Sequence, residues 1–212
     1  NSSCVSMFEG LTVISIDLGE NFNTENVTDM DSMFYNCYLM TSLNVSSFDT
    51  ENVTNMAWMF SDCQALTSLD VSNFNTENVT DMSCMFSQCY ALTPLNVSNF
   101  NTQKVTNMNS MFNGCEALTS LDVSNFNTEK VTDMYAMFYG CQALTSLDLL
   151  SFSFKNNVNT ADMLASVGSN ASNKPISIKV TSEAHTYLTV TTTNCNIDSS
   201  YAKFVKSDGS NW

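Results

Sequence analysis

The sequence predicts an α/β solenoid, in which short strands form a parallel β-sheet on one face and short helices or 3-10 segments form the other. The first observation is a 26-residue unit, LTSLDVSNFNTENVTDMSCMFSQCYA at 66–91, which recurs along the chain with little change. The second is a change of apolar spacing inside that unit. The stretch from Leu66 through Leu69 to Val71 ends with apolar and polar residues in alternation, as in a strand. The later apolar residues recur every three or four positions, as on one helical face. A unit of this length cannot bury its apolar face alone, so the units are expected to stack.

The repeat divides the chain into three parts of a single elongated domain. Residues 1–22 are expected to form a partial N-terminal coil, and 23–165 five to six full repeats. Residues 166–212 are expected to form a C-terminal cap with one or more extra strands, because a solenoid needs a polar end. In each repeat the strand precedes the helical segment, which Thr76 or Thr80 and their equivalents are expected to cap.

Two strands are expected in the cap. Ile176, Ile178 and Val180 alternate with polar residues and predict one strand, while Tyr187–Val190 with the Thr run that follows predict another. The lone His185 is expected to be a solvated cap residue, since no nucleophile lies near it in the sequence.

The cysteines are expected to be buried thiols and not disulfides. Five of them share one column of the repeat, and equivalent side chains in parallel coils point the same way and not at one another. Small buried thiols behave as apolar residues. These five are Cys37, Cys63, Cys89, Cys115 and Cys141. A metal site would need Cys or His residues paired at short spacing, and the sequence has none. Neither a metal site nor a cofactor is therefore expected.

The charge balance argues against two classes of partner. Net charge is −14, and the basic residues are seven Lys with no Arg, so no basic stripe could neutralise phosphates. Nucleic acid is therefore not expected as a partner. Direct membrane insertion is not expected either, because no run of 18 apolar residues occurs.

The pattern L-x-x-L-x-[VL] resembles a leucine-rich repeat, and the full unit closely resembles the 26-residue repeat of BspA-like bacterial surface proteins. The resemblance covers about 7–165. It implies a right-handed curved coil, display on a bacterial cell surface with signal and anchor outside this segment, and adhesion or protein binding. The repeat departs from the general pattern at Phe74, where an Asn or Cys is usual. A spine of stacked Phe rings is therefore expected in place of an internal ladder of amides.

Comparing the repeats with one another separates scaffold from candidate site. The helical segment carries the variable columns, and exposed aromatic residues there are typical of interface anchors. The ligand-binding candidates are Trp58, Tyr38, Tyr90 and Tyr135, with Trp58 expected to form one patch with Tyr38 and Tyr90. The outward strand columns are monotonous, and Asp70, Asn96 and Asp122 are the alternative strand-face candidates.

The leading functional hypothesis is a non-catalytic, surface-displayed binding or adhesion module for a host or bacterial surface protein or glycan. The alternative is a structural stalk or spacer that holds another domain away from the cell. Ice or mineral binding through the Thr ladder and calcium binding on the strand face are disfavoured, because the usual spacings are missing. An enzyme is not expected, since no acid–base pair, activated nucleophile or phosphate loop stands out. The chain is expected to be a monomer or to associate weakly end to end through an uncapped N-terminal edge.

Overall fold

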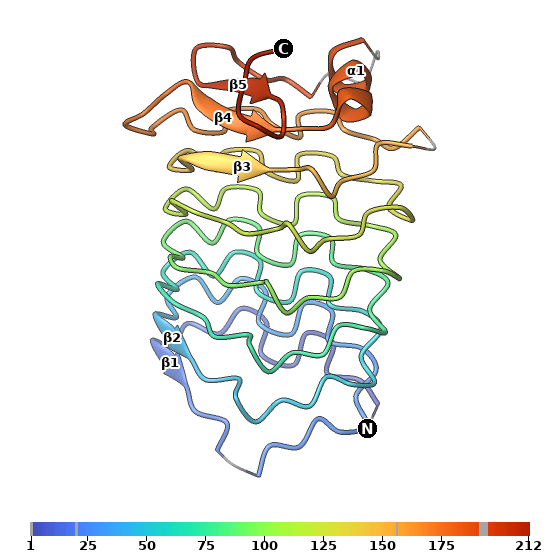
Figure 1. Ribbon diagram of the computed structural model, residues 1–212. Coiled ribbons are helices and arrows are strands. Elements are labelled where there is room, and N and C mark those ends of the chain that lie inside the picture. The colour runs from blue at the N-terminus through green and yellow to red at the C-terminus, as the bar shows by residue number, and fades with distance from the viewer. Residues whose placement is uncertain (1, 20, 156, 191–194) are drawn as a thin grey trace.

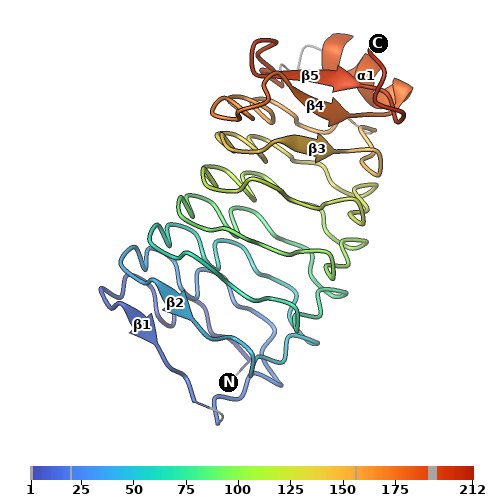
Figure 2. The same cartoon turned by 60° about the vertical axis from the view of Figure 1, so that its left-hand side comes forward.

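The chain winds into a stack of coils, and the computed structural model describes all residues except 1, 20, 156 and 191–194. Figure 1 shows the coils lying one above another from the N-terminus to the C-terminus, and Figure 2 shows the same stack from the side. Every strand pair in the described part of the chain that belongs to a sheet is parallel. The predicted solenoid with parallel strands is therefore confirmed.

Regular strands occur at the two ends of the stack. β1 (Ser15–Ile16) pairs with β2 (Ser42–Leu43). β3 (Ser146–Asp148), β4 (Ile176–Lys179) and β5 (Ala202–Val205) form a second sheet in that order. In the coils between them the same wall is extended without regular strand pairing, and single bonds such as Thr93 N–H to Thr67 O at 3.0 Å link the coils.

The opposite wall is a ladder of turns, so the prediction of helices or 3-10 segments there is wrong. In the Met-Phe segment, alternate amides donate to the next coil: Phe60 N–H reaches Met85 O at 3.0 Å, and Phe86 N–H reaches Met111 O at 3.0 Å. The amides between them close tight turns within the coil, as Met85 N–H does to Met82 O at 3.3 Å. A helix would direct all of these amides to its own carbonyls, whereas the stack uses half of them to join neighbouring coils.

Left-handed residues explain why a helix cannot form. Two columns of the turn ladder have positive φ, a region that L residues rarely adopt and that interrupts a right-handed helix. One comprises Ser32, Trp58, Cys84, Ser110, Ala136 and Asp162, and the other Asn36, Asp62, Gln88, Gly114, Gly140 and Ser166. Successive turns of three residues still direct every third or fourth side chain inward, which produces the helix-like apolar spacing.

Two adjacent stacks of Phe rings fill the core. The rings of the Met-Phe column lie parallel, with centroids 5.7 Å apart for Phe34 and Phe60 and 5.8 Å apart for Phe86 and Phe112. Phe100 belongs to a second column of Phe rings beside the first, and its ring lies 6.5 Å from that of Phe86. Both stacks are buried among Met, Leu and Val side chains. The predicted spine at the Phe74 column is thus present in part, with Phe48 stacked on Phe74 at 6.3 Å and Phe126 on Phe152 at 6.4 Å. The continuous stack is that of the adjacent Met-Phe column.

The amide ladder that Phe was expected to replace lies one residue away. Asn99 Nδ2 donates to Val71 O at 3.1 Å and to Phe74 O at 3.0 Å, and Asn125 Nδ2 donates to Phe100 O at 2.8 Å. The expected exchange of hydrogen bonding for stacking was therefore wrong. Each coil uses both, because the Asn side chain can satisfy carbonyls of the preceding coil while the adjacent Phe faces inward.

In the repeats, the side chains of Thr76, Thr80 and their equivalents join coils and do not cap helices. The hydroxyl of buried Thr76 donates to Asn101 O at 3.0 Å and accepts from Asn101 N–H at 2.7 Å. Thr80 Oγ1 donates to Thr54 O of the preceding coil at 3.1 Å. The Thr76 hydroxyl thus satisfies one backbone N–H and one backbone C=O of the next coil.

All eight cysteines are free and buried, as expected. The structure adds a role for the thiol: Cys63 Sγ donates to Phe34 O at 3.3 Å, and Cys89 Sγ donates to Phe60 O at 3.1 Å. Desolvation by burial raises the pKa of Cys89 to about 12, because the interior disfavours the thiolate. The column therefore holds neutral, unreactive thiols.

The cap contains one predicted strand and one unexpected helix. Ile176 and Ile178 lie in β4, as predicted. Tyr187 and Leu188, expected in a strand, lie in α1 (Ser182–Val190), and most of the Thr run lies outside the described residues. Thr181 begins the helix, because its Oγ1 accepts from Ala184 N–H at 3.1 Å. The second strand of the cap is β5, which follows α1 in the chain and pairs with β4.

The expectation of a solvated His185 is also wrong. Its ring stacks on that of Trp212, with centroids 4.5 Å apart, and meets the ring of Phe204 edge-on at 5.9 Å. This cluster could not be predicted from the repeat pattern, because its members come from α1, β5 and the C-terminal Trp212.

Replacing Phe100 with Ala should lower the free energy of unfolding by about 3–5 kcal/mol, because a large buried ring is lost from the stack. Ser98→Ala, two residues away on the outer face, should cost under about 0.5 kcal/mol. Urea unfolding of both variants measures the difference. Similar midpoint shifts would mean that the inner and outer faces are assigned wrongly.

The five column thiols should not react with a thiol reagent at pH 8 until the chain is unfolded, because burial holds them neutral. Counting thiols with and without denaturant tests this. Rapid labelling of the native protein at Cys63, Cys89 and Cys115 would contradict the assigned burial.

Candidate functional site

The outer side of the turn ladder presents large rings above a floor of small side chains. Trp58 is 40% exposed, and Tyr38, Tyr90 and Tyr135 are exposed to a similar degree. The small residues in the same variable columns are largely buried, namely Ala57, Ser83, Cys84, Ser110 and Ala136. Exposed rings that stand above a closed floor offer contact area to a partner without belonging to the core.

Trp58 contacts a ring that is not among the sequence-based candidates, while the expected patch with Tyr38 and Tyr90 stays a prediction. The ring that contacts Trp58 is that of Tyr35, edge-on at 5.7 Å between centroids, and no ring contact joins Trp58 to Tyr38 or Tyr90 within the described residues. Sequence reasoning missed Tyr35, although it lies in a variable column. The two positions are 23 residues apart and not 26, so a comparison of equivalent positions does not pair them.

Tyr90 is positioned by one contact within its own coil and one with the next coil. Its hydroxyl donates to Gln88 Oε1 at 2.7 Å. Gly114 leaves room for the ring, because a Cβ there would lie 3.3 Å from Tyr90 Cε1. Desolvation also raises the pKa of the Tyr90 phenol, with further contributions from Asp62 and Glu116. These contacts restrict the Tyr90 ring, which lowers the cost of ordering it in an interface.

Trp58 occupies one of the left-handed columns, with φ of 58°. A bulky residue in this region is uncommon, and strained residues of this kind occur preferentially at functional sites. The backbone bond from Trp58 N–H to Ser83 O at 2.8 Å holds the conformation. The backbone ladder therefore fixes the direction of the side chain at position 58, whichever residue occupies it.

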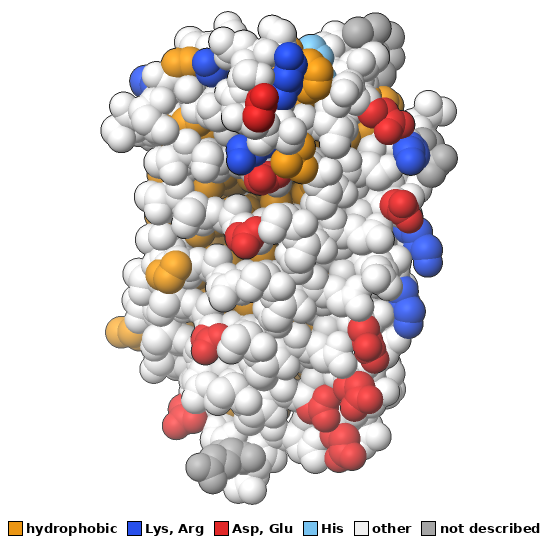
Figure 3. Space-filling view, in the orientation of Figure 1, with side chains coloured by type: hydrophobic (Ala, Val, Ile, Leu, Met, Phe, Trp, Pro, Cys, Tyr) orange, Lys and Arg blue, Asp and Glu red, His pale blue; other side chains and the backbone are white. Residues whose placement is uncertain are grey.

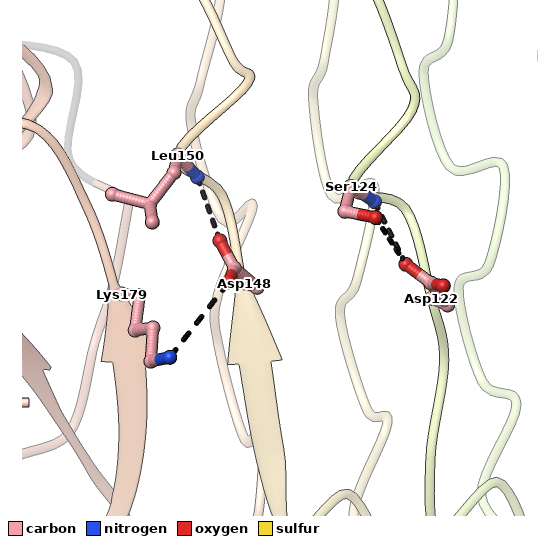
Figure 4. A network of polar contacts seen from close by, with 5 residues as sticks. All are labelled: Asp122, Ser124, Asp148, Leu150 and Lys179. Atoms are coloured by element: carbon pink, nitrogen blue, oxygen red, sulfur yellow. Dashed lines mark hydrogen bonds and ion pairs between the residues drawn. The ribbon is translucent and has the colours of Figure 1, made fainter. Parts of the chain in front are cut away.

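The alternative candidates on the strand face have a structural role. Asp70, Asn96 and Asp122 each accept, through Oδ1, the N–H two residues ahead at 3.0 Å, which forms an Asx turn. The hydroxyl and N–H of Ser124 hold the pKa of Asp122 below its ordinary value. Figure 4 shows Asp122 beside Ser124 and, in the next coil, Asp148 between Leu150 and Lys179. The Asp148–Lys179 pair is 4.0 Å apart and exposed, so it adds little stability.

Charge is distributed unevenly along the stack. All seven lysines lie at or after Lys104, so the earlier coils carry acidic residues alone among charged side chains. In Figure 3 acidic side chains gather along one edge of the lower coils, and lysines lie above them on the same edge. No group of three potential metal ligands occurs among the described residues. No helix in that part of the chain is long and apolar enough to span a membrane.

The repeat is also found by comparison with known protein families. The model of the family described as "Mycoplasma protein of unknown function, DUF285" matches residues 2–96 and again 70–179. The chain belongs to this family. The two DUF285 matches overlap at 70–96, about one repeat, and the second ends with β4, so α1 and β5 lie beyond it. No curated protein and no solved structure matches the chain.

Ala136→Gly should raise the free energy of unfolding by about 0.5–1 kcal/mol, because Ala136 has φ of 51° and glycine adopts that region without a Cβ clash. Ala143→Gly in the same coil is the matched control. It lies outside the left-handed columns, so glycine there should destabilise by a similar amount. Chemical unfolding of both variants measures the two signs. Destabilisation by Ala136→Gly would argue against strain in the turn ladder.

Proposed function

We propose that this protein is a non-catalytic binding or adhesion module, displayed on a bacterial cell surface, that recognises a protein or glycan partner. The observation that carries the proposal is the row of exposed aromatic rings above the buried floor of the turn ladder. Interfaces draw most of their binding energy from a few large side chains of this type, while small neighbours exclude water. The constant core supplies a rigid support for them.

The finer assignment to a right-handed, BspA-like leucine-rich repeat belongs to the same proposal. It is supported by the L-x-x-L-x-V pattern, by parallel stacking of the coils and by membership of a repeat family. Surface display accords with the acidic composition, which keeps a protein soluble and separate from other acidic surfaces.

The alternative proposal is a stalk or spacer. It is supported by the uniform coil-to-coil ladder and by the monotony of the strand face, where Asx turns account for the Asp and Asn columns. Weak end-to-end association remains a further proposal. It rests on apolar side chains of the first coil, since Val5, Met7 and Ile14 are exposed.

Trp58→Ala should weaken partner binding by about 2 kcal/mol or more, because an anchoring ring is removed. Binding would be screened on immobilised host surface proteins and on a glycan array, and then quantified for the strongest partner. Stability should change little, because Ala retains the Cβ and the backbone ladder holds φ. The matched controls are Asp70→Asn and Asp122→Asn, which preserve the Asx turn and should leave binding unchanged.

Two results would contradict this proposal. One is unchanged affinity for every partner in Trp58→Ala and Tyr135→Ala. The other is loss of affinity in the Asp→Asn controls alone, which would move the binding site to the strand face. Absence of any partner for the intact chain would favour the stalk.

A further inference from the structure

A polar hollow of about 840 Å³ lies between the last coils of the repeat and the C-terminal cap. Three segments that are far apart in the sequence form it: the end of a turn segment, the following turn segment, and the loop before β5. Its principal lining residues are Tyr139, Asp162, Ser166, Asn196, Asp198 and Tyr201. The hollow is largely open to solvent, so a ligand there would stay partly exposed.

The backbone fixes the walls of this hollow relative to each other. Gly140 N–H donates to Ala165 O at 2.9 Å, which sets the first two segments side by side. Leu164 N–H donates to Cys195 O at 2.9 Å, and Ile176 N–H donates to Tyr201 O at 2.8 Å, which attach the loop of the cap. The side chains of Asn196 and Asp162 are hydrogen-bonded across the gap. A ligand would therefore enter a preformed site and pay little for ordering it.

The lining combines aromatic faces with hydrogen-bond acceptors. Tyr139 is exposed and Tyr201 is half-buried, so both rings are accessible from the hollow. Asp198 Oδ1 accepts from Ser200 N–H at 2.8 Å and from its hydroxyl at 2.7 Å, which leaves Oδ2 available within the described structure. The same two bonds lower the pKa of Asp198, so its carboxylate is ionised at neutral pH. No basic residue is among the residues described as lining the hollow.

An ionised, acceptor-rich lining suits a ligand with many donors, either a cation or a neutral polyol. A cationic ligand is disfavoured, because Lys174 already places its Nζ 5.8 Å from the centre of the Tyr201 ring. That Nζ is held there by donating to Ser169 O at 3.0 Å. A second ammonium group near the same ring would be repelled by it. Hydroxyl groups could donate to the carboxylates without that cost.

We propose that this hollow is a saccharide-binding subsite, in which a neutral sugar ring packs against Tyr139 or Tyr201 and donates its hydroxyls to Asp162 and Asp198. Aromatic rings provide the apolar contact for the C–H face of a sugar, and carboxylates fix its hydroxyls. The inference rests on the proposed binding function and narrows it, by naming the ligand class for one end of the molecule. Neither Trp58 nor Tyr35 lines the hollow, although Tyr139 occupies the position equivalent to Tyr35 four repeats later.

The test uses the whole chain and a panel of neutral oligosaccharides on an array, followed by calorimetry with the strongest. Tyr139→Ala and Asp198→Asn should each weaken saccharide binding by about tenfold or more, since a single good contact corresponds to that factor. The equivalent position to Tyr139 is Ser61, Ser87 or Asn113 in other coils, so Tyr139→Ala should fold. Asp198→Asn keeps the acceptor for Ser200. Urea unfolding checks both variants.

Ser98→Ala, at an outer strand-face position that does not line the hollow, is the control and should leave saccharide affinity unchanged. Failure of every neutral oligosaccharide to bind, or preferential binding of a lysine-containing peptide at the hollow, would overturn the inference. If saccharides do not bind but Trp58→Ala still weakens a protein partner, the proposed function stands and the subsite does not. If saccharide binding depends on Tyr139 while no partner depends on Trp58, the subsite stands and the aromatic wall is excluded.

Discussion

The hydrogen bond from the Phe amide of each Met-Phe pair to the Met carbonyl of the next coil is the constraint on which the rest of the structure depends. Phe60 N–H to Met85 O at 3.0 Å is one example, and it recurs coil after coil. It fixes the coil spacing, so that rings such as Phe60 and Phe86 stack at 5.8 Å. The same spacing brings Cys89 Sγ to Phe60 O at 3.1 Å. The hydrogen-bond ladder, the stack of Phe rings and the column of thiols are thus consequences of the same coil-to-coil register. This explains why all three share the 26-residue period.

Features that depend on this period could be predicted from the sequence. Stacking, the Phe spine and the buried thiols follow from where apolar residues recur, because equivalent residues in a solenoid must lie above one another. The local conformation of the turn ladder could not be predicted from the sequence. Apolar residues spaced three and four apart fit a helix and a run of tight turns equally well. Gly114 and Gly140 offered the deciding signal. They occupy a column with Asn36 and Asp62, and Gly, Asn and Asp are the residues that favour positive φ.

The cap and the candidate sites depend on contacts between non-equivalent positions, which a repeat comparison does not pair. α1 forms because Thr181 caps it and because Ala184 and Leu188, four residues apart, are both buried, although the local composition favours a strand. Tyr35 meets Trp58 across coils at a non-equivalent offset. The hollow exists only after the loop before β5 docks beside Asp162, so neither its position nor its lining could be read from periodicity.

The left-handed columns explain how a monotonous repeat can carry a varied surface. Inside the stack a side chain must match the equivalent side chains of the coils above and below. Each Phe ring of the Met-Phe column packs on the next Phe ring, and each thiol of the Cys column lies beside a Phe carbonyl of the preceding coil. At the column of Ser32, Trp58 and Ala136 the backbone bonds hold φ positive in every coil, and the side chain contributes little to the ladder itself. A residue as large as Trp and one as small as Ala therefore occupy equivalent positions on the same backbone. The side chain at these positions can change while the core stays constant, at the cost of moderate backbone strain at each non-glycine residue.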